Sequence, residues 1–140
     1  MQYEVIEIKT VQTEKEGQLS FFEGEKTFPF SIKRIYYIHH VPAEARRGAH
    51  AHKTLEQMLF CPYGSVTIFL NNGENEEEIL LDNPNIGIIL KPGLWRDMRW
   101  NIDNSVLCVA ASQYYDENDY IRDYDEYLEY IKNDKKGEIK

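Results

Sequence analysis

The chain has 140 residues, of which 42% are hydrophobic and 29% are charged, and this length and composition predict one globular domain that spans residues 1–140. The formal net charge of -8 argues against a nucleic-acid partner, because contact with a phosphate backbone needs a cationic face. No apolar run approaches the roughly 20 residues of a membrane helix, and the first residues, MQYEVIEIKT, lack the basic and apolar regions of a signal peptide, so we expect a cytoplasmic protein without a membrane partner.

Short segments of alternating polar and apolar residues, interrupted by turn residues about every 8–12 positions, predict an all-β sandwich or barrel. Asn72-Gly73 lies between two such segments and is a strong hairpin signal, since both central residues of a type I′ turn need positive φ. Residues 65–82 are therefore predicted to form a hairpin. The strands expected in chain order cover residues 3–9, 18–23, 32–40, 56–61, 65–71, 76–82, 86–91, 94–100 and 105–112.

The period changes near the end of the chain, where apolar and tyrosine side chains recur at helical spacing. The pattern predicts one amphipathic C-terminal helix over about residues 117–132, begun by Asp116 or Asn118 as its capping residue. Its tyrosine-rich face is expected to pack on the β-body or on a partner subunit. The residues of this face are Tyr120, Ile121, Tyr124, Tyr127, Leu128 and Ile131.

The middle of the chain, residues 32–100, carries equal numbers of acidic and basic residues and all four histidines, whereas both ends are acidic. A basic centre in an acidic protein suits a small anionic ligand, although ordinary solvated surface charge gives the same composition. The candidate chemistry is therefore sought in this middle segment.

The densest group of chemically useful side chains lies in residues 46–53, Arg-Arg-Gly-Ala-His-Ala-His-Lys. Because side chains alternate along a strand, His50 and His52 are expected on the same face, and a regular continuation would add Glu56. His-x-His-x3-Glu is a ligand spacing of metal-binding β-barrels, and it resembles the first motif of the cupin barrels.

The second cupin motif is matched only in part. Gly87 and Pro92-Gly93 resemble its glycine and its proline-glycine turn, but Arg96 occupies the position at which a metal cupin supplies its last histidine. A guanidinium cannot ligate a cation and repels one at short range, so we expect no bound metal. A metal-dependent cupin enzyme remains an alternative.

Two histidines on one face can transfer protons near neutral pH without a metal. In the preceding apolar segment, alternation places Arg34 and Tyr36 on one face and Ile35 and Tyr37 on the other. If the first face lines the same barrel, an arginine, a phenol and two imidazoles meet, and this set can hold an anion and move protons at a carbonyl. The alternative is a structural tyrosine and a surface arginine on an edge strand.

Six separated motifs, in order, resemble the sugar 3,4-ketoisomerase family over about residues 17–130. They are residues 29–38 (PFSIKRIYYI), 47–53 (RGAHAHK), 56–57 (EQ), 64–66 (GSV), 94–98 (LWRDM) and 111–124 (ASQYYDENDYIRDY). The resemblance implies an all-β cupin jelly-roll barrel with one C-terminal helix, no metal or other cofactor, and a homodimer whose protomers exchange N-terminal strands. It also implies action on dTDP-4-keto-6-deoxyglucose, whose keto group moves from C4 to C3 upstream of an aminotransferase that makes 3-amino-3,6-dideoxy sugars for surface glycans.

Carried over by motif, the resemblance implies that His50 is the principal base and that Tyr36 and His52 lie close to the sugar. His50 would remove the C3 proton to give a cis-enediol, and Tyr36 or His52 would pass a proton on. The pattern leaves the division of roles between the two histidines open. The expected contacts to the substrate or its phosphates are Arg34, Arg47, Gln57, Arg96 and Trp95, whose ring could stack on a base or a sugar.

Two further alternatives are another type of cupin enzyme and, from a different class of protein, a non-catalytic binding module. A nucleotide-sugar 3,5-epimerase-like cupin also uses histidine chemistry without metal, but it normally has a longer chain and a buried His-Asp pair, and no aspartate is visible near His50 in the sequence. The chain could also be a non-catalytic sugar-nucleotide binding module. Absence of His50 or Tyr36 would favour that alternative, but both residues are present.

Overall fold

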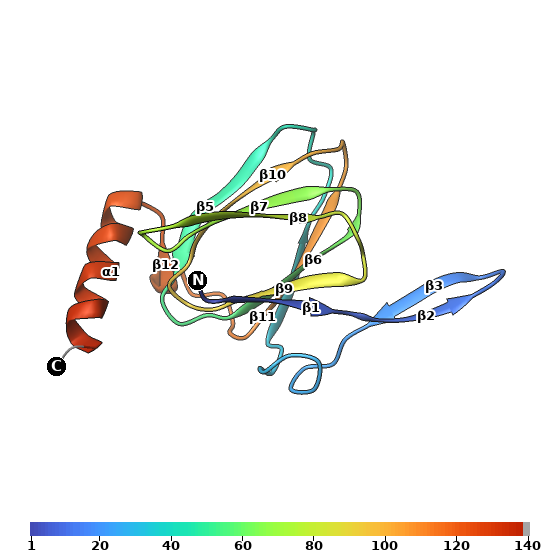
Figure 1. Ribbon diagram of the computed structural model, residues 1–140, viewed down its shortest axis with the longest axis horizontal. Helices are drawn as coiled ribbons and strands as arrows, with labels where there is room; N and C mark the ends of the chain where they lie inside the picture. Colours follow the sequence, from blue (N-terminus) through green and yellow to red (C-terminus); the bar gives the residue numbers. More distant parts are fainter. Residues whose placement is uncertain (139–140) are drawn as a thin grey trace.

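Two five-stranded sheets form the body of the computed structural model, which describes residues 1–138 (Figure 1). The strand order of the first sheet is β1(Tyr3–Glu7), β9(Ile86–Leu90), β6(Gln57–Tyr63), β11(Val106–Ala111) and β4(Arg34–Ile38). The strand order of the second is β12(Tyr120–Ile121), β5(Arg46–His52), β10(Trp95–Trp100), β7(Val66–Asn71) and β8(Glu76–Leu81). The predicted all-β barrel with one C-terminal helix is confirmed.

The main apolar core lies between the two sheets. Along β7, the inward side chains of Val66, Ile68 and Leu70 are fully buried, and on β10 the buried Met98 and Trp100 belong to the same cluster. These positions follow the period of two that a strand imposes. Burial of this apolar surface is the main favourable contribution to folding, and it holds the sheets in place around the polar end of the barrel.

The hairpin predicted at Asn72-Gly73 is confirmed, because β7 and β8 pair from Val66 to Asn71. Its turn differs from the type I′ turn that the dipeptide predicts. Asn71 already pairs with Glu76, and only Gly73 has positive φ, at 93°. The Asn72 side-chain oxygen accepts hydrogen bonds from the backbone N–H groups of Glu74 and Asn75, which stabilises a longer loop of the kind that asparagine favours.

The N-terminal segment was predicted as one strand over residues 3–9 and is instead divided. β1 pairs with β9, and β2(Lys9–Thr13) pairs with β3(Gly17–Phe21) in a separate hairpin that extends away from the barrel (Figure 1). Ile8 separates the two parts: its side chain is buried, and its backbone N–H donates to the Asn85 carbonyl oxygen at 2.6 Å. Residue alternation continues through Ile8, so the sequence pattern does not reveal this break.

The C-terminal helix begins later than predicted. Residues Glu117–Asp119 form a short 3-10 helix and β12 pairs with β5, so α1 covers Tyr124–Glu138. Asp116 caps the 3-10 helix, and the Asp123 carboxylate accepts from the Glu126 backbone N–H at the start of α1. Pairing with an open strand edge outweighs the local helical period here. No helix in residues 1–138 is long and apolar enough to cross a bilayer.

The tyrosine-rich face of α1 packs on the barrel as predicted. Tyr127 is fully buried, and its hydroxyl donates to the Gly93 carbonyl oxygen at 2.7 Å. Leu128 and Ile131 pack against the same small cluster. This helix holds the segment before it, residues 112–123, against the edge of the second sheet, and that segment forms part of the candidate site.

Candidate active site

Inward side chains from β4, β5 and β10 meet at a cavity of about 280 Å³. The structure brings together four residues that the sequence singled out, namely Arg34, Tyr36, Arg47 and His50. His52, Gln57 and Arg96 are buried beside them. The remaining residues of the wall are Ile38, Gly48, Met98, Tyr115, Tyr120 and Arg122.

His50 and His52 lie on the same face of β5, with ring centroids 4.9 Å apart and ring planes at 89°. The strand is not regular before them, because Gly48 and His50 pair with the adjacent residues Asp97 and Arg96 of β10 and Ala49 between them is left unpaired. Gly48 has φ of 105°, and a Cβ at this position would lie 2.8 Å from Met98 Sδ. Glycine at this position therefore allows the bulge that directs His50 into the barrel.

Both imidazoles are held in the neutral form. Burial is the largest cause and lowers the pKa of His50 to about 4, and the Arg96 guanidinium lowers it further. Burial, followed by the charge of Arg96, also lowers the pKa of His52. The Nε2 atoms of both rings are buried and have no hydrogen-bond partner within residues 1–138. Two neutral imidazoles beside a cavity are competent proton acceptors at neutral pH.

Glu56 does not join the two histidines, contrary to the expectation from a regular strand. β5 ends at His52, and Glu56 lies in the following loop, 3.4 Å from the Lys91 ammonium. Within the described residues, no three side chains of histidine, cysteine, aspartate and glutamate gather as metal ligands do.

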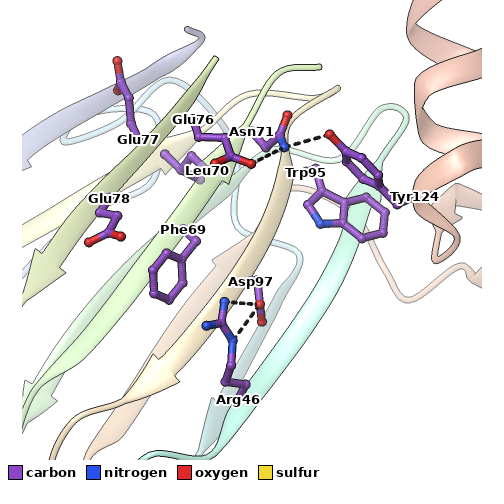
Figure 2. A pocket seen from close by; sticks show the side chains of 10 residues that line it. All are labelled: Arg46, Phe69, Leu70, Asn71, Glu76, Glu77, Glu78, Trp95, Asp97 and Tyr124. Carbon is purple, nitrogen blue, oxygen red and sulfur yellow. Dashed lines mark hydrogen bonds and ion pairs between the residues drawn. The ribbon is translucent and has the colours of Figure 1, made fainter. Parts of the chain in front are cut away.

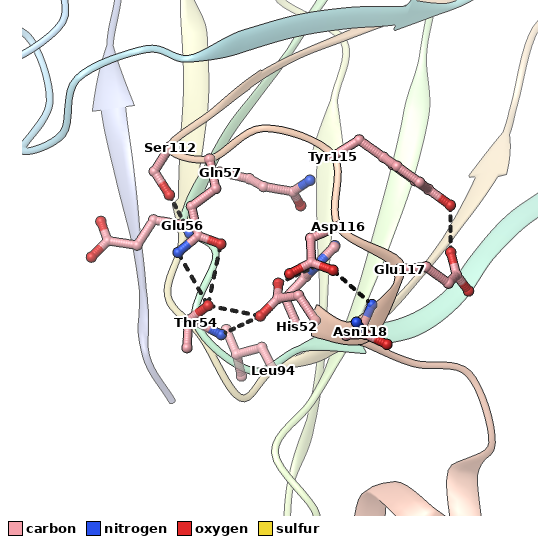
Figure 3. Close-up of polar contacts among 12 residues, drawn as sticks. His52, Thr54, Glu56, Gln57, Leu94, Ser112, Tyr115, Asp116, Glu117 and Asn118 are labelled. Carbon is pink, nitrogen blue, oxygen red and sulfur yellow. Dashed lines mark hydrogen bonds and ion pairs between the residues drawn. The ribbon is translucent and has the colours of Figure 1, made fainter.

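An aspartate does lie beside the histidines, which the sequence did not reveal. The Asp119 carboxylate oxygen Oδ2 is 3.0 Å from His52 Nδ1, and both side chains are buried. The other oxygen, Oδ1, accepts from the backbone N–H and the hydroxyl of Thr54, each at 2.8 Å; Figure 3 shows Thr54 beside His52. Asp119 is 67 positions away from His52 in the sequence, and the helical pattern predicts that it lies in the C-terminal helix. The sequence therefore does not indicate that Asp119 contacts His52.

A second hydrogen-bonded group links Tyr36, Gln57 and Arg96. Arg96 donates to the Gln57 amide oxygen Oε1 and to the Leu94 carbonyl oxygen. Gln57 Nε2 in turn donates to the Tyr36 hydroxyl oxygen at 2.9 Å. Burial lowers the pKa of Arg96 to about 10, so this guanidinium remains charged at neutral pH and contributes positive charge next to the cavity.

Further arginines line the cavity. The Arg34 guanidinium lies over the Tyr36 and Tyr115 rings, at 5.3 and 5.5 Å, and its Nε and Nη2 atoms are buried without a partner in the described part of the chain. Arg122 binds the Glu117 carboxylate through two hydrogen bonds. Free guanidinium donors beside a cavity can bind an anionic group such as a diphosphate.

The structure does not bring Trp95 into this site. Adjacent residues of a strand point to opposite faces, so Trp95 points outward where Arg96 points inward. Its ring packs against Tyr124 and Tyr127 of α1, at centroid distances of 5.2 and 5.5 Å. It lines a separate outer cavity of about 510 Å³ that also includes Arg46 (Figure 2). The expectation that Trp95 contacts the substrate beside His50 is therefore not supported by the structure.

The segment before α1 contributes residues to which sequence reasoning gave no role. Tyr120 lies with its ring centroid 4.4 Å from His52 and 5.2 Å from His50, and the Tyr115 hydroxyl donates to the Glu117 carboxylate at 2.5 Å (Figure 3). These residues fall in the segment 111–124 that carried the family resemblance, so the motif was the available signal.

Comparisons with known proteins agree with the geometry. The family model described as "FdtA: WxcM-like, C-terminal" matches residues 1–132. The chain is similar to the TDP-4-oxo-6-deoxy-alpha-D-glucose-3,4-oxoisomerase of Aneurinibacillus thermoaerophilus, with 44% identity over 131 residues and 94% of each chain covered.

Two solved structures are also similar. One is a 3,4-ketoisomerase from Helicobacter canadensis, with a TM-score of 0.91, 44% identity, and 94% of this chain and 98% of that chain covered. The other is a histidine-to-asparagine variant of the 3,4-ketoisomerase QdtA from Thermoanaerobacterium thermosaccharolyticum in complex with TDP-4-keto-6-deoxyglucose. Its TM-score is 0.89 at 42% identity, with 94% of both chains covered.

Proposed function

Because this chain belongs to the FdtA family of sugar 3,4-ketoisomerases, and is therefore an isomerase, we propose that it converts dTDP-4-keto-6-deoxyglucose to the corresponding 3-keto sugar. The observation that carries the proposal is the pair of neutral buried histidines, His50 and His52, beside a cavity that is also lined by arginines. Two of the relatives named above, the Aneurinibacillus thermoaerophilus enzyme and the QdtA variant, are named for this TDP-sugar or for a complex with it.

The proposed reaction begins at C3, whose hydrogen is acidified by the neighbouring C4 ketone. His50 removes this hydrogen as a proton, which gives a cis-enediol after protonation of the C4 oxygen. Tyr36 supplies a proton to that oxygen, and the positive charge of Arg96 favours negative charge developing there. Loss of the C3 hydroxyl proton and protonation of C4 complete the isomerisation. Since hydrogen moves only as protons, the sequence of steps needs no redox cofactor.

The diphosphate of the substrate is proposed to bind at the arginines. Arg34 and Arg47 lie in the wall of the cavity, and Arg34 has donor groups without a partner in the described residues. A guanidinium binds phosphate oxygens through paired, charge-assisted hydrogen bonds. This set would hold the nucleotide sugar with its hexose toward His50, in a protein that is acidic overall.

A homodimer with exchanged N-terminal strands forms part of the proposal. A two-stranded hairpin is marginally stable by itself in water, yet β2 and β3 extend from the barrel (Figure 1). Val11 and Leu19 pair across this hairpin and are more than half exposed, as are Ile35 and Tyr37 on the edge strand β4. A second copy that exchanges this segment symmetrically would cover such apolar surface.

The 3-keto product is consistent with a reaction that precedes an amino-group transfer. A ketone at C3 is the group that an aminotransferase converts to an amine, so the proposed product leads to 3-amino-3,6-dideoxy sugars for surface glycans. An epimerase would instead leave the ketone at C4. The His52–Asp119 pair is a feature that we associated with the epimerases, so the assay below separates the two activities.

The proposed function is tested by reducing the reaction mixture with borodeuteride after incubation with dTDP-4-keto-6-deoxyglucose. A ketone at C3 gives deuterium at C3 of the reduced sugar, whereas unreacted or epimerised substrate carries deuterium at C4. We expect C3 label with protein that has been treated with a chelator. Label at C4 alone would contradict ketoisomerase activity, and activity that appears only after metal is restored would favour the metal-dependent alternative.

A further inference from the structure

We propose that Asp119 is a positioning residue that fixes His52 in the tautomer with hydrogen on Nδ1, so that His52 Nε2 is the second proton acceptor of the site. The inference rests on the proposed function and assigns the roles of the two histidines. His50 accepts the proton from C3, and His52 accepts the proton from the C3 hydroxyl group.

The Asp119 carboxylate is held so that it cannot exchange its two oxygens. Oδ1 accepts from two donors of Thr54, the backbone N–H and the hydroxyl, and Oδ2 faces His52 Nδ1 at 3.0 Å. The Asp119 carbonyl oxygen also accepts from the Lys53 backbone N–H at 3.0 Å. The Thr54 hydroxyl also lies near the Gln113 amide, at 3.2 Å from Oε1 and 3.1 Å from Nε2, but its contact with Asp119 Oδ1 is shorter, at 2.8 Å, and a charged acceptor forms the stronger hydrogen bond.

This arrangement determines the tautomer of His52. A neutral imidazole carries one hydrogen, and a carboxylate is a hydrogen-bond acceptor only. Since His52 is buried and its pKa is lowered, its single hydrogen lies on Nδ1 and is donated to Asp119. Nε2 then carries a lone pair and has no partner in the described residues.

The proton balance of the reaction gives this lone pair a use. Moving the ketone from C4 to C3 removes one proton from carbon C3 and one from its hydroxyl oxygen, and adds one proton to C4 and one to its oxygen. Separate acceptors for the carbon proton and the hydroxyl proton allow both to be removed in place, and His50 and His52 lie 4.9 Å apart with both Nε2 atoms unpartnered in the described residues. When His52 becomes protonated, the Asp119 carboxylate stabilises the imidazolium, as the aspartate does in a catalytic triad.

Asp119→Asn tests the inference sharply because Thr54 controls how the new amide lies. The two Thr54 donors keep the amide oxygen on their side, so the amide NH2 group faces His52 Nδ1. His52 must then accept at Nδ1 and carry its hydrogen on Nε2, which cannot take a proton. We expect kcat to fall about 10²–10⁴-fold, with KM changed by less than about threefold because no substrate contact is removed.

The structural readout is the ¹⁵N NMR spectrum of histidine-labelled protein, with the His52 signals assigned by their loss in His52→Gln. We expect hydrogen on Nδ1 in the wild type and on Nε2 in Asp119→Asn. Asp116→Asn is the matched control, because this carboxylate lies three residues away and caps only the 3-10 helix. It should leave both kcat and the His52 tautomer unchanged.

A wild-type spectrum with the His52 hydrogen on Nε2 would overturn the inference. An Asp119→Asn variant that carries the His52 hydrogen on Nε2 and still has near-normal kcat would also overturn it. The wild-type spectrum decides the tautomer even if Asp119→Asn does not fold. Thr54→Val, which removes the hydroxyl donor to the Asp119 carboxylate and keeps the backbone N–H donor, then gives the activity test with an expected loss in kcat. Wild-type protein that has hydrogen on Nδ1 but does not convert the sugar would overturn the proposed function and the acceptor role of His52, and would leave the tautomer assignment standing.

Discussion

Gln57 donates a hydrogen bond from Nε2 to the Tyr36 hydroxyl oxygen over 2.9 Å. The direction of this bond is set by Arg96, which has donors only and therefore faces the Gln57 amide oxygen. Because the Tyr36 oxygen already accepts a hydrogen bond, its own hydrogen is free to point toward the cavity. Gln57, which the sequence suggested as a substrate contact, is thus engaged at both ends with protein groups.

Gln57→Glu should reverse the direction of the hydrogen bond between residue 57 and Tyr36. The new carboxylate would accept from Arg96 and from the Tyr36 hydroxyl, so the Tyr36 hydrogen would no longer be available to the C4 oxygen of the substrate. We expect kcat to fall about 10²-fold, within the range for loss of a general acid, and Tyr36→Phe should lose a similar amount. Steady-state kinetics with both variants provide the measurement, and a Gln57→Glu variant with near-normal kcat would contradict the assigned role of Tyr36 as donor.

His50→Asn should abolish turnover while the fold is kept. The asparagine side chain is similar in size but cannot act as a base at neutral pH, so we expect kcat to fall about 10³-fold or more. The matched control is His39→Asn, because His39 is exposed and is not part of the cavity wall. Equal losses in the two variants would show that the effect is not specific to His50 as the base.

The pH dependence of the reaction should reflect the lowered pKa of His50. A base with pKa about 4 remains neutral through the range in which an unperturbed histidine becomes protonated, near pH 6.5. We therefore expect kcat/KM to be constant between about pH 6 and 8 and to decline only as the pH approaches 4. A half-maximal value near pH 6.5 would instead indicate a solvent-exposed histidine as the base.

The lowered pKa values of His50 and His52 also make the stability of the fold depend on pH. Between pH 6.5 and 4, the unfolded chain binds protons at these histidines while the folded protein does not, so the free energy of unfolding decreases as the pH falls through this window. The contribution is fully present above pH 6.5. Thermal unfolding should show a falling Tm over this range, and the dependence should be weaker in His50→Asn. A dependence as steep as that of the wild type would contradict the lowered pKa of His50.

Leu19→Glu should weaken the proposed dimer. Leu19 is 62% exposed on the protruding hairpin, and burying such a side chain contributes about 1.5–3 kcal/mol, so the dissociation constant should rise about 10–100-fold or more. Leu80→Glu is the matched control, since Leu80 is 54% exposed but lies on β8, outside the N-terminal hairpin. Sedimentation equilibrium gives the two constants. A monomeric wild type, or equal constants for the three proteins, would contradict exchange of the N-terminal strands.

The period of two along each strand was sufficient to predict much of the candidate site. It placed Arg34 with Tyr36 and His50 with His52, and the structure brings these pairs to one side of the barrel. The same rule also separates Trp95 from Arg96, because neighbours on a strand cannot both face inward. Assigning both to the substrate was therefore inconsistent with the strand that contains them.

The residues that sequence reasoning missed depend on contacts between distant parts of the chain. Tyr120 fits a helical period in the sequence, but it pairs with His52 across two strands. This pairing also brings Asp119 to His52 Nδ1. A local pattern reports which face a side chain occupies within its own element, whereas the position of residues 112–122 against β5 depends on tertiary pairing that outweighs local propensity.

The most direct test of the account is proton NMR of dTDP-4-keto-6-deoxyglucose incubated with the chelator-treated protein in deuterated water. The enediol mechanism predicts a 3-keto sugar with solvent deuterium at C4, and the couplings of the C4 proton in a parallel reaction in ordinary water, or the alcohol obtained by reduction, identify the epimer formed. Substrate that returns unchanged, or that exchanges only at C5, would contradict the mechanism and favour the epimerase-like alternative.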